Sequence, residues 1–377
     1  MNQDNKRIFG LDLLRFAAII SVLLVHSTSA LFNENPVVGI GGFLGVEFFF
    51  VLSGMLIGTI IIKTHIKEKV TTFSSIKVFW VRRWFRTLPN YYLMFIVYLI
   101  LAFVSKDHPD IHGLKWVAYL LFLQNATTPE INSFFGVAWS LCIEEWFYLL
   151  FPIFLILMQV FFKKKSISLL ATIFIFIIIP LVGRVILSFT NTLEWDSGFR
   201  KMLFLRLDSI AIGVLGAFIN HYFINFWTKN KNRLFVLGTI LLVSSFVISY
   251  YTSKYDFAKQ PKVGDIGFFA KTGLFTLIDI SIALFLPVLC ALQINKSNYL
   301  GKMVTFISLI SYSLYLLHPV VIILTIHFLR NESRIIMFSV IWMSSIIGAY
   351  LQYNLFEIKM TSLRDRFFKK KQVVTVT

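Results

Sequence analysis

Charged residues are scarce in this sequence. They make up 15% of the 377 residues, whereas hydrophobic residues make up 57%, and an ordinary soluble domain has roughly a quarter of its residues charged. The apolar residues also fall in runs of about twenty, the length that a helix needs to cross a hydrocarbon layer roughly 30 Å thick. The composition therefore excludes a soluble globular domain and predicts an all-α polytopic membrane protein.

Cysteine is nearly absent, and acidic residues are about half as frequent as basic ones. Cys142 and Cys290 both lie inside apolar runs, which excludes a disulfide framework and a zinc knuckle. The 36 Lys and Arg against 19 Asp and Glu give a net charge of +17. These basic residues flank apolar runs, where orientation signals and anionic lipid account for them. We therefore expect a lipid bilayer, and no nucleic acid, as a partner.

Ten apolar runs predict about ten transmembrane helices. A cleavable signal peptide is not expected, because the first run ends at Leu31 and Phe32 without a small-residue cleavage pattern. The run 114–123 is too short to cross and is expected to form a re-entrant or interfacial helix. The predicted spans are 11–31, 39–62, 88–104, 139–162, 167–189, 203–226, 234–251, 272–292, 303–327 and 335–356.

Basic residues concentrate in alternate connections, and this pattern predicts the orientation. Lys and Arg are typical of cytoplasmic connections. They dominate the N-terminus, the connections after every second span, and a tail of about 359–377, whereas the other connections mix acids with bases. Both termini are therefore predicted to be cytoplasmic. We find no second domain and no internal repeat, so residues 1–377 are expected to form a single membrane-embedded domain.

Several ionisable residues lie inside the predicted spans, where they are costly and therefore candidates for function. They are Asp12, Arg15, His26, Glu47, Glu144, Glu145, Arg184, Arg206, Asp208, Asp279 and His318. With about 1.5 Å of rise per residue, Arg15 lies towards the cytoplasm, and the residues from His26 onwards lie in the outer half. The sequence thus predicts an outer polar layer suited to proton transfer.

A basic cluster lies at the inner side. Arg82, Arg83 and Arg86 precede Pro89, which is expected to mark the start of the third helix. Guanidinium groups match the geometry of phosphates. A donor that carries phosphates would bind the inner arginine cluster, and an acceptor modified outside would react at the outer polar layer. The presence of both layers therefore predicts group transfer across the membrane.

Six sequence strings occur in an order typical of one family. They are "LDLLRFAAIISVLLVH", "GFLGVEFFFVLSGMLIG", "RRWFRTLP", "AWSLCIEEWFYLLFP", "LRLDSIAIG" and "SYSLYLLHP". With these strings on the matching spans, the chain resembles the membrane acyltransferase-3 family over nearly its whole length. The resemblance implies transfer of an acyl group, usually acetyl from cytoplasmic acetyl-CoA, to a hydroxyl of a surface or exported glycan, in a bacterial inner membrane.

The family motifs imply roles for particular residues. One family motif is an arginine followed, after ten residues, by a histidine, and it matches Arg15 and His26. Another is a pair of arginines separated by two residues, and it matches Arg83 and Arg86. Its serine-glycine pair matches Ser53, which either contacts the donor or packs against a neighbouring helix. The resemblance therefore implies that acetyl-CoA binds near the arginines and reacts near His26, directly or through a covalent acyl relay.

The chemistry of the outer layer leaves several alternatives open. A neutral His26 is expected to take the proton of the acceptor hydroxyl, with Glu47, Glu144 or Glu145 orienting it. Glu144 and Glu145 point about 100° apart on a helix, so they cannot share a partner. The structural alternative for the one further from His26 is a salt bridge to Arg184 or Arg206.

Other residues have both functional and structural interpretations. His318 precedes Pro319, so it is either catalytic or bonded to a backbone carbonyl freed by a kink. Arg206 and Asp208 are candidates for substrate binding, although pairing with residues on other spans is favoured. Asp12 and Asp279 are expected to have partners on their own helices. We expect no metal site, because the remaining histidines lack metal-ligand spacing.

Functions of two other classes fit the same composition. Buried carboxylates and histidines also serve proton coupling in a transporter or a lipid-linked-sugar flippase. A non-catalytic membrane protein that binds CoA or a glycan partner is the other alternative.

Overall fold

A computed structural model describes residues 7–32, 36–67, 72–105, 115–126, 134–190, 193–252, 266–294 and 298–364. Within these ranges ten helices are long and apolar enough to cross a membrane, which confirms the predicted all-α polytopic fold. The predicted connections 106–114, 127–133 and 253–265, and the tail beyond residue 364, lie outside the described residues.

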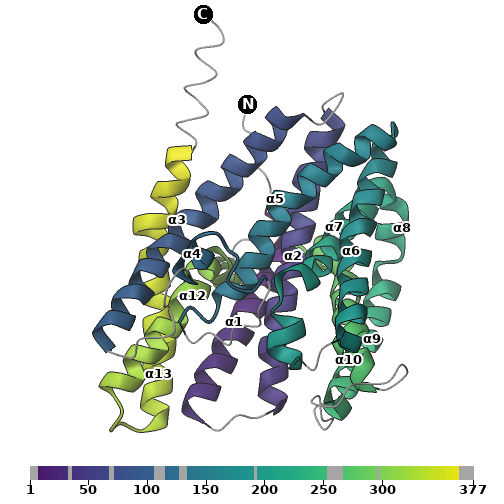
Figure 1. Ribbon diagram of the computed structural model, residues 1–377. Helices are drawn as coiled ribbons and strands as arrows, with labels where there is room; N and C mark the ends of the chain where they lie inside the picture. Colours follow the sequence, from purple (N-terminus) through teal and green to yellow (C-terminus); the bar gives the residue numbers. More distant parts are fainter. Residues whose placement is uncertain are drawn as a thin grey trace, which may run out of the picture.

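Figure 1 shows the helices as a bundle in which segments far apart in sequence lie side by side. The longer helices are α1 (Phe9–Leu31), α2 (Pro36–Lys67), α3 (Phe73–Ser105), α5 (Ala138–Phe161), α6 (Lys165–Thr190), α7 (Leu207–Tyr222), α9 (Lys231–Thr252), α10 (Ile266–Ala283), α12 (Tyr299–Phe328) and α13 (Arg334–Gln352). The short ones are α4 (Lys115–Leu120), η1 (Asp196–Arg200), η2 (Leu203–Leu205), α8 (Ile224–Lys229), α11 (Leu286–Ala291) and η3 (Tyr353–Glu357). The six residues of α4 fit the short run that was expected not to cross.

The third span differs from its prediction. Pro89 was expected to start the helix, but α3 begins at Phe73 and continues through Pro89. Arg83 lies ten residues after that start, or about 15 Å along the helix axis. Because membrane helices tolerate proline where neighbouring groups satisfy the freed backbone, this proline does not mark a boundary. The arginines therefore belong to the helix and not to a connection.

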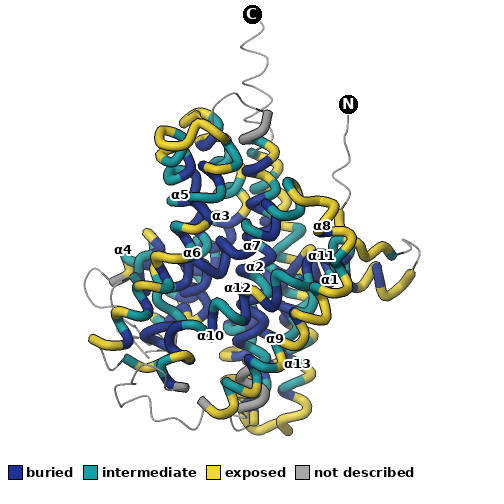
Figure 2. The backbone as a smooth tube through the Cα atoms, turned by 90° about the vertical axis from the view of Figure 1, so that its right-hand side faces the viewer, coloured by how far each residue is buried: buried dark blue, intermediate teal, exposed yellow. Residues whose placement is uncertain are grey.

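The outer surface of the bundle is apolar, as a lipid environment requires. Figure 2 shows buried segments inside the molecule and exposed ones around it. On α9 the exposed residues include Val236, Ile240, Val243 and Val247. Apolar surface of this extent on a soluble monomer would mark an interface. In a polytopic membrane protein it faces lipid.

Helices α2 and α7 approach each other closely. A Cβ atom on Gly54 would lie 2.0 Å from the carbonyl oxygen of Ile210 and 2.8 Å from the Cα atom of Gly213. Small residues at such crossings let two backbones approach in a membrane. The predicted packing role of the serine-glycine pair is therefore confirmed for its glycine.

Replacing Gly54 with alanine should push α2 and α7 apart. We expect the substitution to destabilise the protein by about 1–3 kcal/mol, the usual effect of overpacking, measured as a lower Tm of the purified protein. Gly41 is the matched control on α2, because its Cβ would meet only Val25 at 3.6 Å. Equal Tm values for the two variants would contradict a tight contact.

Candidate functional site

Two histidines are in contact at one end of the site. We name this end outer and the opposite end inner, after the predicted orientation. His26 of α1 and His318 of α12 lie 2.7 Å apart, Nδ1 to Nε2, with their ring planes 18° apart. The Nδ1 of His318 lies 3.0 Å from the carbonyl oxygen of Leu314. The partner of His26 is therefore His318 and not one of the three glutamates that the sequence favoured. His318 also has a backbone hydrogen bond to Tyr315, whose carbonyl oxygen loses its helical donor at Pro319, so the predicted structural role of His318 stays open beside the catalytic one.

This chain of contacts assigns the tautomers of both rings. A carbonyl oxygen only accepts, so the Nδ1 of His318 carries a proton, and its Nε2 is an acceptor while the ring is neutral. The Nδ1 of His26 then donates to it, which leaves the Nε2 of His26 with a free lone pair. His318 is fully buried, whereas His26 is exposed in the wall of an outer cavity of about 210 Å³. His26 is thus arranged to accept a proton from a molecule in that cavity.

The inner part of the site is a large cavity lined with arginines. It has a volume of about 1060 Å³, and Arg15, Arg83 and Arg86 line it. Two residues from the chain's first and last spans also line this cavity: Arg7, just before the first span, and Arg364, at the end of the last. The first and last spans therefore have these ends on the same side of the bundle.

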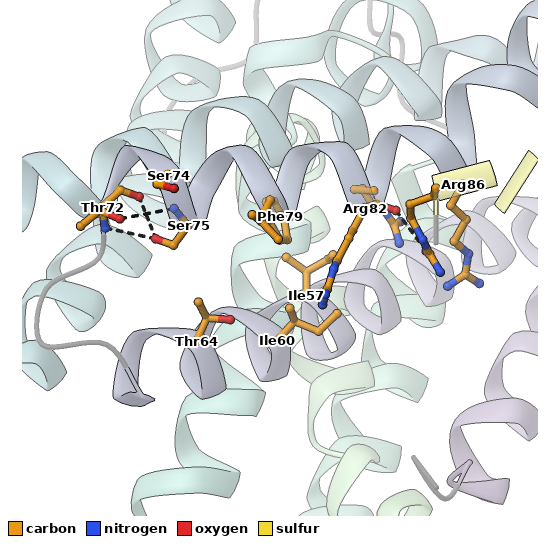
Figure 3. A pocket seen from close by; sticks show the side chains of 12 residues that line it. Ile57, Ile60, Thr64, Thr72, Ser74, Ser75, Phe79, Arg82 and Arg86 are labelled. Atoms are coloured by element: carbon orange, nitrogen blue, oxygen red, sulfur yellow. Dashed lines mark hydrogen bonds between the residues drawn. The ribbon is translucent and has the colours of Figure 1, made fainter. Parts of the chain in front are cut away.

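A second inner cavity of about 700 Å³ adjoins the first and shares Arg83, Arg86 and Arg364 with it. Figure 3 shows its walls, with Arg82 and Arg86 on α3 and Ile57, Ile60 and Thr64 on α2. The groove thus combines guanidinium groups with an apolar floor. This combination suits a phosphate-bearing molecule with a long chain.

The two arginines of the family motif have different surroundings. Arg83 donates to the hydroxyl of Tyr148 at 2.6 Å, lies 3.5 Å from Glu144, and stacks on the Tyr148 ring. Arg86 is exposed, and within the described ranges no hydrogen bond or ion pair holds it. Arg86 can therefore bind an incoming anion, whereas Arg83 is already part of a network.

Glu144 belongs to this inner network. Its two carboxylate oxygens accept hydrogen bonds from Ser53 and Tyr148, each at 2.9 Å. It was predicted to lie in the outer layer and, as one alternative, to pair with Arg184 or Arg206. Glu144 lies elsewhere than predicted because Arg83 is ten residues into α3 and contacts Glu144 of α5 there. Ser53 therefore has a hydrogen-bonding role besides the packing of its neighbour Gly54.

A narrow cavity joins the inner and outer parts. It measures about 80 Å³ and shares Arg15, Arg83 and Arg86 with the large inner cavity. At its other end it shares Val46 and Tyr315 with the outer cavity. The Tyr315 hydroxyl lies 2.7 Å from that of Ser140, so this tyrosine stands between the arginines and His26.

Two fully buried ion clusters lie outside these cavities. Arg184 of α6 donates to both carboxylate oxygens of Asp208, at 2.9 and 2.7 Å. Arg206 donates to Glu47 at 2.6 Å and lies 3.7 Å from Asp279. The favoured pairing of Arg206 and Asp208 with other spans is confirmed, and their role in substrate binding stays a prediction.

Some partner predictions were wrong. Asp279 accepts a hydrogen bond from Ser209 of α7 at 2.7 Å, and not from its own helix. Asp12 lies 4.0 Å from Arg15 on its own helix, but its close partners are Arg7 at 2.6 Å and Ser308 at 2.8 Å. The prediction for Asp12 is right in part, because Arg15 lies on its helix and Arg7 just before it, whereas Ser308 and Ser209 show that other helices also bring donors to these buried carboxylates.

Glu145 is buried, and its Oε2 atom has no hydrogen-bond partner within the described residues. The adjacent glutamates thus have different surroundings, as the helical geometry predicted. The geometry gives Glu145 no contact with His26, so its catalytic assignment stays a prediction, as does that of Glu47.

Sequence reasoning missed several residues of the site. Tyr148 is one turn after Glu144, and Tyr315 is three residues before His318, so helical spacing alone places each beside a predicted residue. Glu357 of η3 lines the inner cavity, and so does Arg364, which the sequence had assigned to the basic tail. No local pattern links these two residues to α3.

Comparisons with known proteins give a family match over most of the chain. The model of a family described as an acyltransferase domain matches residues 8–353. The chain is 27% identical to O-acetyltransferase OatA of Staphylococcus aureus over 96% of its own length and 58% of the relative. It is 28% identical to peptidoglycan O-acetyltransferase OatA of Listeria monocytogenes over 85% of its length and 50% of that relative. The chain thus spans about half the length of these relatives. No solved structure matches it.

Proposed function

Because this chain belongs to the membrane acyltransferase-3 family, we propose that it is a membrane O-acyltransferase that moves an acetyl group from cytoplasmic acetyl-CoA to a hydroxyl of a cell-envelope glycan. The proposal treats residues 1–377 as one membrane-embedded domain. It sets the protein in the bacterial inner membrane with both termini in the cytoplasm. The names of the two relatives support acetyl and a glycan as the transferred group and the acceptor.

One observation carries the proposal: three adjoining cavities run from Arg86 to His26 and share their lining residues. The nucleotide phosphates of the donor would bind Arg86 and Arg15 in the inner cavity. The narrow cavity lined by Ser53 and Glu144 would hold the pantetheine arm. The thioester would then approach the outer histidines, while the charged nucleotide stays at the inner side.

The proposed reaction is acid–base catalysis by the histidine pair. The Nε2 of His26 accepts the proton of the acceptor hydroxyl while the hydroxyl oxygen attacks the thioester carbonyl. The new C–O bond forms, the C–S bond breaks, and the thiolate of CoA leaves and takes up the proton that His26 holds, which returns His26 to its neutral form. His318 fixes the tautomer and shares the positive charge through the hydrogen bond from His26. The residues thus act as base and positioning partner.

A transfer assay tests the proposal. The purified protein is reconstituted in liposomes with radiolabelled acetyl-CoA and a panel of glycans. We expect label to appear on a glycan as an alkali-labile ester. Movement of a glycan across the bilayer without label on it would instead favour a transporter, and donor binding without transfer would favour a non-catalytic protein.

Replacing Arg86 with glutamine should weaken donor binding. Hydrogen bonds to charged groups contribute about 1.5–3 kcal/mol, so we expect the KM for acetyl-CoA to rise about tenfold to a hundredfold. The KM for S-acetylpantetheine, which lacks the nucleotide phosphates, should not change. Lys77 is exposed on the same helix and lines none of the cavities described above, so Lys77→Gln is the control. An unchanged KM for acetyl-CoA would remove Arg86 from the donor site.

A further inference from the structure

The outer cavity beside His26 has a charged rim that the proposed reaction does not use. Its walls include the aromatic rings of Phe43, Trp139 and Trp195. Its rim carries the side chains of the turn η1 and the next residue, which are Asp196, Arg200 and Lys201. These residues come from α2, α5 and the segment after α6. The fold therefore builds an aromatic and basic recess around the proposed base.

The rim has two cations and one anion. Asp196 forms ion pairs with both Arg200 and Lys201. Burial raises the pKa of Asp196, but the two adjacent cations lower it by more, so its pKa lies below its ordinary value. Asp196 is therefore ionised at neutral pH, and the rim keeps a net charge of +1.

The aromatic side chains fix the geometry of this rim. The guanidinium of Arg200 lies over the Trp139 ring at 4.7 Å, and its side chain is only 14% exposed. Trp195 stacks on Phe275 with ring centroids 5.2 Å apart, and its indole nitrogen donates to the carbonyl oxygen of Ala270 at 2.9 Å. Side chains that are already ordered lose little entropy when a ligand binds.

We propose that this recess recognises the acceptor through an anionic group, a carboxylate or a phosphate carried by the sugar. Arg200 and Lys201 bind the anion, because a guanidinium fork matches either group, and Trp195 covers the apolar face of the ring. A sugar held this way places a hydroxyl next to His26. The inference rests on the proposed function and adds the class of acceptor to it.

Replacing Asp196 should change the KM for an anionic acceptor in the opposite direction from replacing Arg200 or Lys201. An anionic acceptor competes with Asp196 for the two cations. Asp196→Asn should therefore lower the KM for an anionic acceptor, whereas Arg200→Gln and Lys201→Gln should each raise it about tenfold or more. None of the three should change the KM for a neutral acceptor or for acetyl-CoA. A role confined to folding would not separate anionic from neutral acceptors.

The test uses matched acceptors and the full chain in vesicles of neutral phosphatidylcholine. The carboxylate pair is the methyl glycoside of N-acetylmuramic acid and its amide. The phosphate pair is N-acetylglucosamine 1-phosphate and methyl N-acetylglucosaminide. Arg330, exposed after α12 and outside the recess, provides the control Arg330→Gln. Charge recognition would be overturned if Arg200→Gln raised the KM for the anionic and the neutral member of each pair alike. It would also be overturned if Asp196→Asn raised the KM for the anionic acceptors.

A binding measurement separates this inference from the proposed function. Tryptophan fluorescence of the wild-type protein without acetyl-CoA should change on addition of the anionic sugars and not of the neutral ones. That result supports the recess even if no acetyl transfer occurs. If neither anionic sugar binds, the proposed recognition of an anionic acceptor is overturned. Lys201→Gln serves if Arg200→Gln does not fold, because the Lys201 side chain is 31% exposed.

Discussion

Replacing His26 with alanine should reduce acetyl transfer by about a hundredfold to ten-thousandfold, the usual contribution of a general base. The Nε2 of His26 has the lone pair that faces the outer cavity, since its Nδ1 donates to His318. An alanine leaves no group there to take the proton of the acceptor hydroxyl. The measurement is the initial rate of label transfer from acetyl-CoA, at equal amounts of folded protein.

His318 provides the companion test, because its proposed role is to position His26. His318→Gln keeps an acceptor at the end of the side chain and should retain more activity than His318→Leu. The pH profile of the rate should also shift in His318→Leu, since the base loses its hydrogen-bonded partner. Undiminished transfer by a well-expressed His26→Ala variant would defeat the mechanism.

Replacing Arg184 with methionine should destabilise the protein by about 3–5 kcal/mol, the usual result of removing one partner of a buried ion pair. Arg184 and Asp208 are both fully buried and joined by two hydrogen bonds. Methionine fills similar space but leaves the carboxylate without its partner. The measurement is the Tm of the purified protein in detergent.

Two further variants make this result specific. Arg184→Met with Asp208→Leu removes both charges and should recover most of the stability, because apolar residues often replace a buried pair without loss. Arg233, exposed near the start of α9, is the control, and Arg233→Met should leave the Tm unchanged. An Arg184→Met variant as stable as the wild type would show that the pair does not hold α6 to α7.

The fold was predictable from the sequence because run length decides it. A run of about twenty apolar residues has few stable alternatives to a membrane helix, and the ten predicted spans correspond to the ten observed helices. The ends were less predictable. Pro89 reads as a start signal in isolation, but α3 carries sixteen residues before it, since its first half packs against other helices.

The site was predictable in its residues but not in its pairings. His26 and His318 are 292 residues apart, and nothing local to either indicates that their rings meet. Likewise, Arg206 and Asp208 were expected to pair with other spans, but the choice of Glu47 and Arg184 depends on how α2, α6 and α7 pack. Arg200 could not be predicted as a site residue, because it lies in a connection that mixes acids with bases and no local pattern places it beside His26.

The buried cluster of Arg206, Glu47 and Asp279 also constrains biogenesis. Glu47 enters the membrane on α2, but the arginine that pairs with it follows 159 residues later, on the segment leading into α7. An unpaired carboxylate is costly in lipid, so a nascent chain that ends before α7 carries an uncompensated charge. We therefore expect the second span to be stable in the membrane only once α7, which lies in the sixth span, has been synthesised.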